Sequence, residues 1–131
     1  MERFPTDLQI RFELGQLYFQ AGKISEAIQE FQKAQGNPHR RIAALNYLAQ
    51  CFAKRKMFGP ATRTLEGALK EKMVFDDEKK DLVYNLGCVL DAMGKKDDAI
   101  KQFELIYEVD IGYRDVAAKV DAFYAGGQTP A

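Results

Sequence analysis

The side chains that could carry out chemistry in this 131-residue chain are few and lie far apart. Cys51 and Cys88 are separated by 37 residues, and His39, the single histidine, is near neither of them. A zinc site needs about four ligands at local spacing, and a hydrolytic nucleophile needs a base beside it. We therefore expect no metal site, no cofactor and no catalytic residue, with both cysteines reduced and acting as small core side chains.

Two pairs of adjacent acids are the remaining candidates for general acid and base catalysis. Asp76-Asp77 and Asp97-Asp98 each lie where a helix is expected to begin. Carboxylates at such positions cap free backbone N–H groups and interact favourably with the helix dipole, which accounts for both pairs. The sequence therefore predicts that the protein is not an enzyme.

The overall charge limits the classes of partner. The chain has 19 lysine and arginine residues together and 19 aspartate and glutamate residues together, so the net charge is zero. Proteins that bind nucleic acid or anionic membranes need a basic excess, so we expect neither partner. No segment approaches 18 consecutive apolar residues, and the first 20 residues contain no apolar leader. These features predict a cytoplasmic protein.

A repeated pattern of small and large apolar residues organises the chain. A small residue recurs on three segments, and an alanine follows it 12 residues later each time: Gly15 and Ala27, Ala49 and Ala61, and Gly87 and Ala99. Larger apolar residues flank these positions at spacings of 3 and 4, which places them on one face of a helix. Two antiparallel helices can approach closely where both carry small side chains. Each unit is therefore predicted to be a helix pair.

The first unit reads Leu14-Gly15-x-x-Tyr18, then Ala27-x-x-x-Phe31 and Ala34, and it resembles the tetratricopeptide-repeat (TPR) family. The other units read Leu48-Ala49-x-x-Phe52 with Ala61-x-x-x-Leu65, and Leu86-Gly87-x-x-Leu90 with Ala99-x-x-x-Phe103. The resemblance implies an all-α, right-handed α-solenoid with seven helices. We expect a single domain over residues 1–131, with repeats at about 8–41, 42–75 and 80–113. A capping helix at about 114–125 and a flexible tail at 126–131 would follow.

Local signals predict where several helices begin and end. Thr6, Asn37 and Asp76 each fit the residue that caps a helix N-terminus. Gly22 and Gly94 fit the left-handed residue that ends the first helix of a pair. Four extra residues between the second and third units predict a longer turn, or an extended helix end, around Met73-Val74-Phe75-Asp76-Asp77.

The resemblance also implies a binding surface, because the first helix of each TPR pair lines the concave side of the solenoid. The candidates are the residues of those helices that are not expected to pack inward. They are Phe12, Gln16, Phe19, Asn46, Tyr47, Gln50, Tyr84, Asn85 and Cys88. Aromatic anchors beside adaptable amides suit a peptide or a partner helix.

The leading hypothesis is therefore a protein-interaction scaffold that binds a peptide or helical segment in the groove. The alternative is a structural module that packs with itself or with flanking domains; a monomer in solution would favour the first. Some TPR domains hold chaperone C-terminal tails through lysines, asparagines and an arginine. The corresponding positions here are Phe12, Gln16, Tyr47, Asp81 and Asn85. We expect no binding of such a tail, because Asp81 carries the wrong charge.

Overall fold

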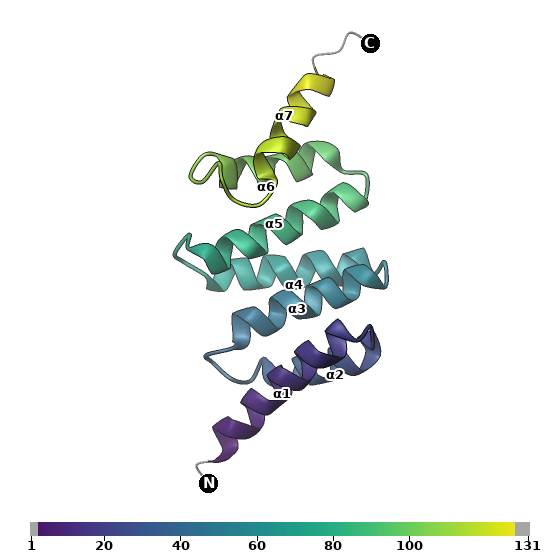
Figure 1. Ribbon diagram of the computed structural model, residues 1–131, viewed down its shortest axis with the longest axis vertical. Coiled ribbons are helices and arrows are strands. Elements are labelled where there is room, and N and C mark those ends of the chain that lie inside the picture. The colour runs from purple at the N-terminus through teal and green to yellow at the C-terminus, as the bar shows by residue number, and fades with distance from the viewer. Residues whose placement is uncertain (1–2, 128–131) are drawn as a thin grey trace.

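The computed structural model describes residues 3–127, which form helices and no strand. The helices are α1 (Arg3–Gln20), α2 (Ile24–Ala34), α3 (Arg41–Lys54), α4 (Phe58–Glu71), α5 (Asp77–Ala92), α6 (Lys96–Tyr107) and α7 (Val116–Gly127). Consecutive helices stack along one axis, with α1 and α7 at opposite ends (Figure 1). The predicted all-α solenoid of seven helices is confirmed. Within the described residues, no helix is long and apolar enough to cross a membrane.

The small residues of the repeat set how closely the two helices of each pair approach. A Cβ atom at Gly15 would lie 2.7 Å from the ring of Phe31, so no larger residue fits there without a shift. In the middle pair, Ala49 stands where the first pair has glycine, and Leu65 stands where it has phenylalanine. Both Ala49 and Leu65 are fully buried. A bulkier residue on the first helix is thus matched by a smaller one on the second.

The turn inside each pair uses a residue in the left-handed conformation. Gly22 (φ 79°) and Gly94 (φ 84°) occupy this position as predicted. The middle pair has Lys56 there, with φ 61°, so this turn has the same backbone conformation without glycine. A residue with a Cβ is disfavoured in that region, so Lys56 carries local strain. The longer turn predicted before the third unit was wrong, because residues 72–76 between α4 and α5 are fewer than residues 35–40 between α2 and α3. The extra residues extend the helices instead: α4 has 14 residues and α2 has 11, and α5 has 16 residues and α3 has 14.

Only one of the three predicted N-caps is found at the start of a helix. The Asp76 carboxylate accepts a hydrogen bond from the backbone N–H of Lys79 at 3.0 Å, as expected for a cap. The prediction for Thr6 was wrong, because α1 begins earlier, at Arg3. The prediction for Asn37 was also wrong. Its side-chain oxygen accepts from the N–H of His39 within a turn, and α3 begins only at Arg41.

Helix α7 covers the C-terminal end of the apolar core. Val116 and Val120 are buried in a cluster with Phe103 and Ile106 of α6. The helix begins two residues later than expected, and it includes positions 126 and 127, which the sequence had assigned to a tail. Residues 128–131, the rest of that expected tail, lie outside the described residues.

Candidate functional site

The first helices of the pairs lie closer to one another than the second helices do. Helix α3 contacts both α1 and α5, whereas α2 and α4, and α4 and α6, make no contact within the described chain. The face formed by α1, α3 and α5 is therefore the inner side of the curve. It contains a cavity of about 580 Å³, which we call the groove. Its lining residues are Phe19, Gln20, Ala43, Asn46, Tyr47, Gln50, Glu78, Asp81, Asn85 and Arg114.

Amide side chains from two helices meet in the centre of the groove. The Nδ2 group of Asn85 on α5 donates to Oδ1 of Asn46 on α3 at 2.7 Å. Gln50, one turn further along α3, donates weakly to the backbone oxygen of Asn46 at 3.4 Å. This arrangement leaves Nδ2 of Asn46 and Oδ1 of Asn85 outside the bond between the two side chains. The centre of the groove can therefore both donate to and accept from a peptide backbone.

The aromatic side of the groove is formed by Tyr47 and Phe19, and packing on neighbouring side chains fixes its position. Tyr47 stacks on Phe31 with ring centroids 4.9 Å apart, and Phe19 meets Tyr47 edge-on at 5.4 Å. Gln16 donates to the Tyr47 hydroxyl at 3.3 Å. Lys54 places its ammonium 5.4 Å from the centre of the Phe19 ring. Tyr47 therefore presents a fixed surface, while Gln16 lies behind it and is not among the residues that line the cavity.

Phe12 does not belong to the groove, and its prediction as an open binding residue was wrong. Its side chain is 6% exposed and packs edge-on against Phe31 and Tyr47. The reason is helical geometry. Phe12 lies three residues before Gly15, on the face of α1 that packs against α2. Asn46 stands at the equivalent position before Ala49 and lines the groove, so this spacing alone does not distinguish a core residue from a groove residue.

One end of the groove is closed by charged and aromatic groups from the loop after α6. Arg114 forms an ion pair with Asp81 at 3.1 Å and lies 4.9 Å from the centre of the Tyr84 ring. The Tyr113 hydroxyl also donates to Asp81. Burial and this hydrogen bond raise the pKa of Tyr113. Arg114 has φ 42°, so the loop adopts a disfavoured backbone conformation in order to reach α5.

Tyr84 and Cys88 lie beside the groove rather than in it. The Tyr84 hydroxyl donates to Asp115 at 2.6 Å, and burial together with this bond raises the pKa of Tyr84. Cys88 lines an adjoining cavity of about 190 Å³, which shares Gln50 and Asn85 with the groove. Burial raises the pKa of Cys88, so its thiol stays protonated at neutral pH. Both cysteines are free, but neither is an activated nucleophile.

Three charged residues of the groove, Glu78, Asp81 and Arg114, were absent from the predicted set of binding residues. Arg114 follows the last repeat, and no local signal indicates that its loop folds back onto α5. Glu78 forms an ion pair with Lys72 across the turn between α4 and α5, at 2.9 Å. The four-residue insertion in the sequence was the only available signal for this contact. The predicted residues that the structure brings together are Phe19, Asn46, Tyr47, Gln50 and Asn85.

Comparisons with known proteins agree with this geometry. The family model described as "Tetratricopeptide repeat" matches residues 8–36 and 81–110. These two segments are tetratricopeptide repeats. They correspond to the pair α1 and α2 and to the pair α5 and α6, and the unmatched pair α3 and α4 lies between them in the same stack. The TPR fold is a scaffold for protein–protein interaction, and the family is in general not enzymatic.

Solved structures share the TPR fold at low sequence identity. A crystal structure of MamA has a TM-score of 0.78 at 23% identity, covering 96% of this chain and 71% of that chain. The first TPR of Spaghetti (RPAP3), bound to the HSP90 peptide SRMEEVD, has a TM-score of 0.78 at 18% identity. There the match covers 93% of this chain and 96% of the other. A search of curated proteins found no match.

Proposed function

We propose that the groove binds a peptide segment of a partner protein. The observation that carries this proposal is the hydrogen-bonded pair Asn46 and Asn85, which offers a donor and an acceptor at the centre of the groove. Tyr47 and Phe19 supply aromatic surface on one side. Rigid aromatic groups beside adaptable amides suit recognition of an extended backbone. The middle helix pair is, on this proposal, the second repeat of one continuous binding domain.

The charges of the groove favour a partner segment without a dense cluster of charge. Asp81 is paired with Arg114, and Glu78 is paired with Lys72. A charged partner residue would have to displace one of these internal ion pairs. The binding free energy would therefore come from backbone hydrogen bonds and apolar contacts, and the affinity should depend only weakly on salt.

Replacing both asparagines by alanine is expected to weaken partner binding by at least about tenfold, since each lost hydrogen bond contributes on the order of 1 kcal/mol. Wild type and the Asn46→Ala/Asn85→Ala variant would be used to capture proteins from native lysate, with quantitative mass spectrometry as the readout. The affinity of each differential partner would then be measured by calorimetry.

The matched control for this experiment is Gln32→Ala, which removes an exposed amide from α2, on the opposite face of the solenoid. This variant should capture the same partners as wild type. If partners bind the double variant and wild type equally well, the groove is not the binding site.

A chaperone C-terminal tail is not expected to bind. The Asp81 carboxylate lies in the groove, already held by Arg114 and Tyr113, and it repels an incoming carboxylate. Fluorescence polarisation with the labelled peptide SRMEEVD should give no binding at micromolar protein. Micromolar binding that disappears when the peptide C-terminus is amidated would show that this expectation is wrong.

An assembly role is the second candidate, and the outer side of α1 favours it. Ile10 is 46% exposed and Leu17 is 61% exposed. They are two helical turns apart and so share one side of the helix. A second copy or a flanking domain would bury both. Light scattering at increasing concentration separates the candidates, since self-association through α1 should be lost in an Ile10→Ser/Leu17→Ser variant.

A further inference from the structure

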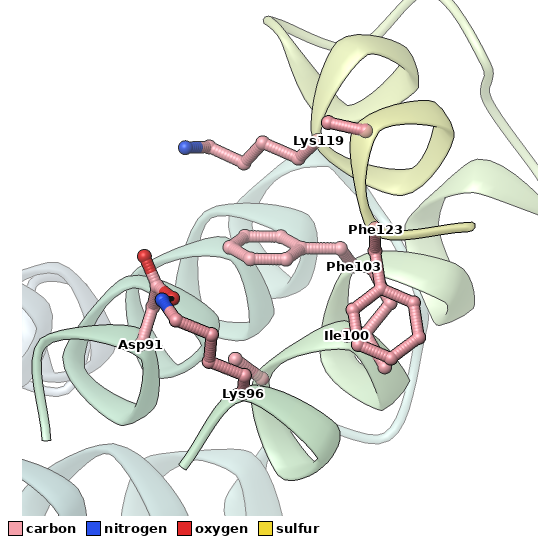
Figure 2. A pocket seen from close by; sticks show the side chains of 8 residues that line it. Asp91, Lys96, Ile100, Phe103, Lys119 and Phe123 are labelled. Atoms are coloured by element: carbon pink, nitrogen blue, oxygen red, sulfur yellow. Dashed lines mark hydrogen bonds and ion pairs between the residues drawn. The ribbon is translucent and has the colours of Figure 1, made fainter. Parts of the chain in front are cut away.

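A second cavity, of about 330 Å³, lies between the last helices of the solenoid. Figure 2 shows Lys119 extended on one side of the Phe103 ring, and Asp91 with Lys96 on the other. Phe123 of α7 lies beside Ile100 of α6. Ala99 and Ala122 complete the lining, which is mainly apolar. The groove and this cavity share no lining residue.

The first repeat shows one way in which the equivalent space is filled. Tyr47 follows Phe31 by 16 residues, and Lys119 follows Phe103 by the same 16. Both pairs are in contact: the Tyr47 ring stacks on Phe31 at 4.9 Å, and the Lys119 ammonium lies 5.4 Å from the centre of the Phe103 ring. Lys119 therefore stands at the position equivalent to Tyr47, but its linear side chain leaves a cavity beside Phe103 where the first repeat has a stacked ring.

At two further positions around the cavity, the third repeat has a charged residue where the first repeat has an apolar one. Phe19 lies four residues after Gly15, and Asp91 lies four residues after Gly87. Phe19 packs on Tyr47 in the first repeat, whereas Asp91 is exposed at the rim of the cavity. Ile24 lies three residues before Ala27 on α2, and Lys96 lies three residues before Ala99 on α6. The third repeat thus has the charged residues Lys119 and Asp91 at the two positions where the first repeat has the aromatic rings of Tyr47 and Phe19.

We propose that this cavity binds an aromatic side chain of a partner peptide, next to an acidic residue of the same peptide. The incoming ring replaces the ring that Tyr47 provides in the first repeat, and it contacts Phe103 and Phe123. The lining residues include two lysines, Lys96 and Lys119, and one acid, Asp91. Lys96 is paired with Asp91 at 2.8 Å, whereas the ion pair that Lys119 forms within the described residues is the longer one, 3.7 Å to Asp115. Lys119 is thus the cation that can pair with a partner carboxylate and lie over the bound ring.

The size of the cavity fits one side chain. It lies at the lower end of the range of about 300–1,000 Å³ for small-molecule sites. A planar ring uses this space better than a branched aliphatic group because its faces can lie against Phe103 and Phe123. This inference goes beyond the proposed groove function and does not depend on it, since the two sets of lining residues are separate.

The test uses three capped tetrapeptides as probes: Ala-Phe-Glu-Ala, Ala-Leu-Glu-Ala and Ala-Phe-Lys-Ala, each acetylated and amidated. Titration would be followed by methyl and amide NMR signals of Ala99, Ile100 and Ala122. The Phe-Glu probe should shift these signals, and each of the other two should bind about tenfold more weakly, for loss of the ring or of the ion pair.

Two substitutions at one position separate the contributions. Lys119→Tyr should fill the cavity, abolish binding of the Phe-Glu probe and raise the thermal unfolding midpoint, as expected if it restores the stack of the first repeat. Lys119→Met keeps the cavity open and should retain the preference for Phe over Leu while losing the preference for Glu over Lys. The Asn46→Ala/Asn85→Ala variant should bind the probe as wild type does, which keeps this test independent of the groove.

Several results would overturn the proposal. Equal binding of the Phe-Glu and Leu-Glu probes would remove the aromatic preference, and no shift with any probe would remove the site. Unchanged binding by a folded Lys119→Tyr variant would place the probe elsewhere. If the same signals shift when the protein alone is concentrated, a second copy of the chain occupies the cavity.

Discussion

Replacing Phe31 by alanine is expected to lower the free energy of unfolding by about 3–5 kcal/mol, the range for a buried phenylalanine. The ring is fully buried. It lies against Gly15 of α1, which has no side chain that could move into the space, and it stacks on Tyr47 of α3. A cavity would therefore remain between three helices. Urea denaturation followed by circular dichroism would measure the change.

The matched control for this substitution is Phe75→Ala. Phe75 is half-buried in the loop before α5, with Lys79 over its ring at 5.9 Å. Loss of this ring should cost clearly less, because water can enter the space. Equal losses of stability in the two variants would mean that the stack between α1, α2 and α3 contributes nothing beyond ordinary burial.

The Phe31→Ala substitution should lower stability mainly in the first repeat. Repeats of a solenoid contact only their neighbours, so stability is transmitted mainly between adjacent pairs. Phe31 belongs to the core cluster of the first repeats, whereas Phe103 and Val116 belong to a second cluster. Hydrogen exchange in the Phe31→Ala variant should therefore increase more in α1 and α2 than in α6.

The repeat architecture could be predicted because its determinants are local and periodic. Small residues spaced by 12 within each unit indicate where the two helices of a pair approach closely. The structure shows such an approach at Gly15 and Gly87, where the nearest side chains are the rings of Phe31 and Phe103. The left-handed turn residues were equally readable, since Gly22 and Gly94 stand at the expected positions. Spacing alone fixes these features, without knowledge of any distant contact.

The helix starts and the edges of the groove could not be predicted in the same way. Asn37 and Asp76 carry the same capping signal, yet only Asp76 caps a helix. The difference arises because Asn37 accepts from a neighbouring N–H in a turn, which competes with helix initiation. Arg114 reaches the groove only because its loop folds back onto Asp81 and Tyr84, a contact over some thirty residues of sequence.

Replacing Gly87 by alanine is expected to destabilise the protein by about 1–3 kcal/mol, as for other overpacked cores. The new Cβ atom would lie 2.8 Å from the Phe103 ring, which is 4% exposed and cannot move freely. Alanine favours a helix over glycine by roughly 0.5–1 kcal/mol, so the clash must exceed that gain. Thermal and urea unfolding of the single variant would give the net value.

The middle repeat indicates how this clash can be relieved. It pairs Ala49 with Leu65 where the third repeat pairs Gly87 with Phe103. Phe103→Leu alone should be destabilising, because the space beside Gly87 would be left empty. In the Gly87→Ala/Phe103→Leu variant, each substitution should offset part of the stability that the other one loses. The expected coupling free energy is about 0.5–3 kcal/mol. A double-mutant cycle in urea measures that coupling.

The matched control for the cycle is Gly67→Ala on α4, where an added Cβ atom meets nothing within 4 Å. This exposed helical position should gain roughly 0.5–1 kcal/mol from alanine, so the two glycines should respond with opposite signs. The packing argument requires both the sign difference and the coupling. If Gly87→Ala and Phe103→Leu are simply additive, the ring is not what excludes a side chain at position 87. The distance between α5 and α6 must then be set by other contacts along the pair.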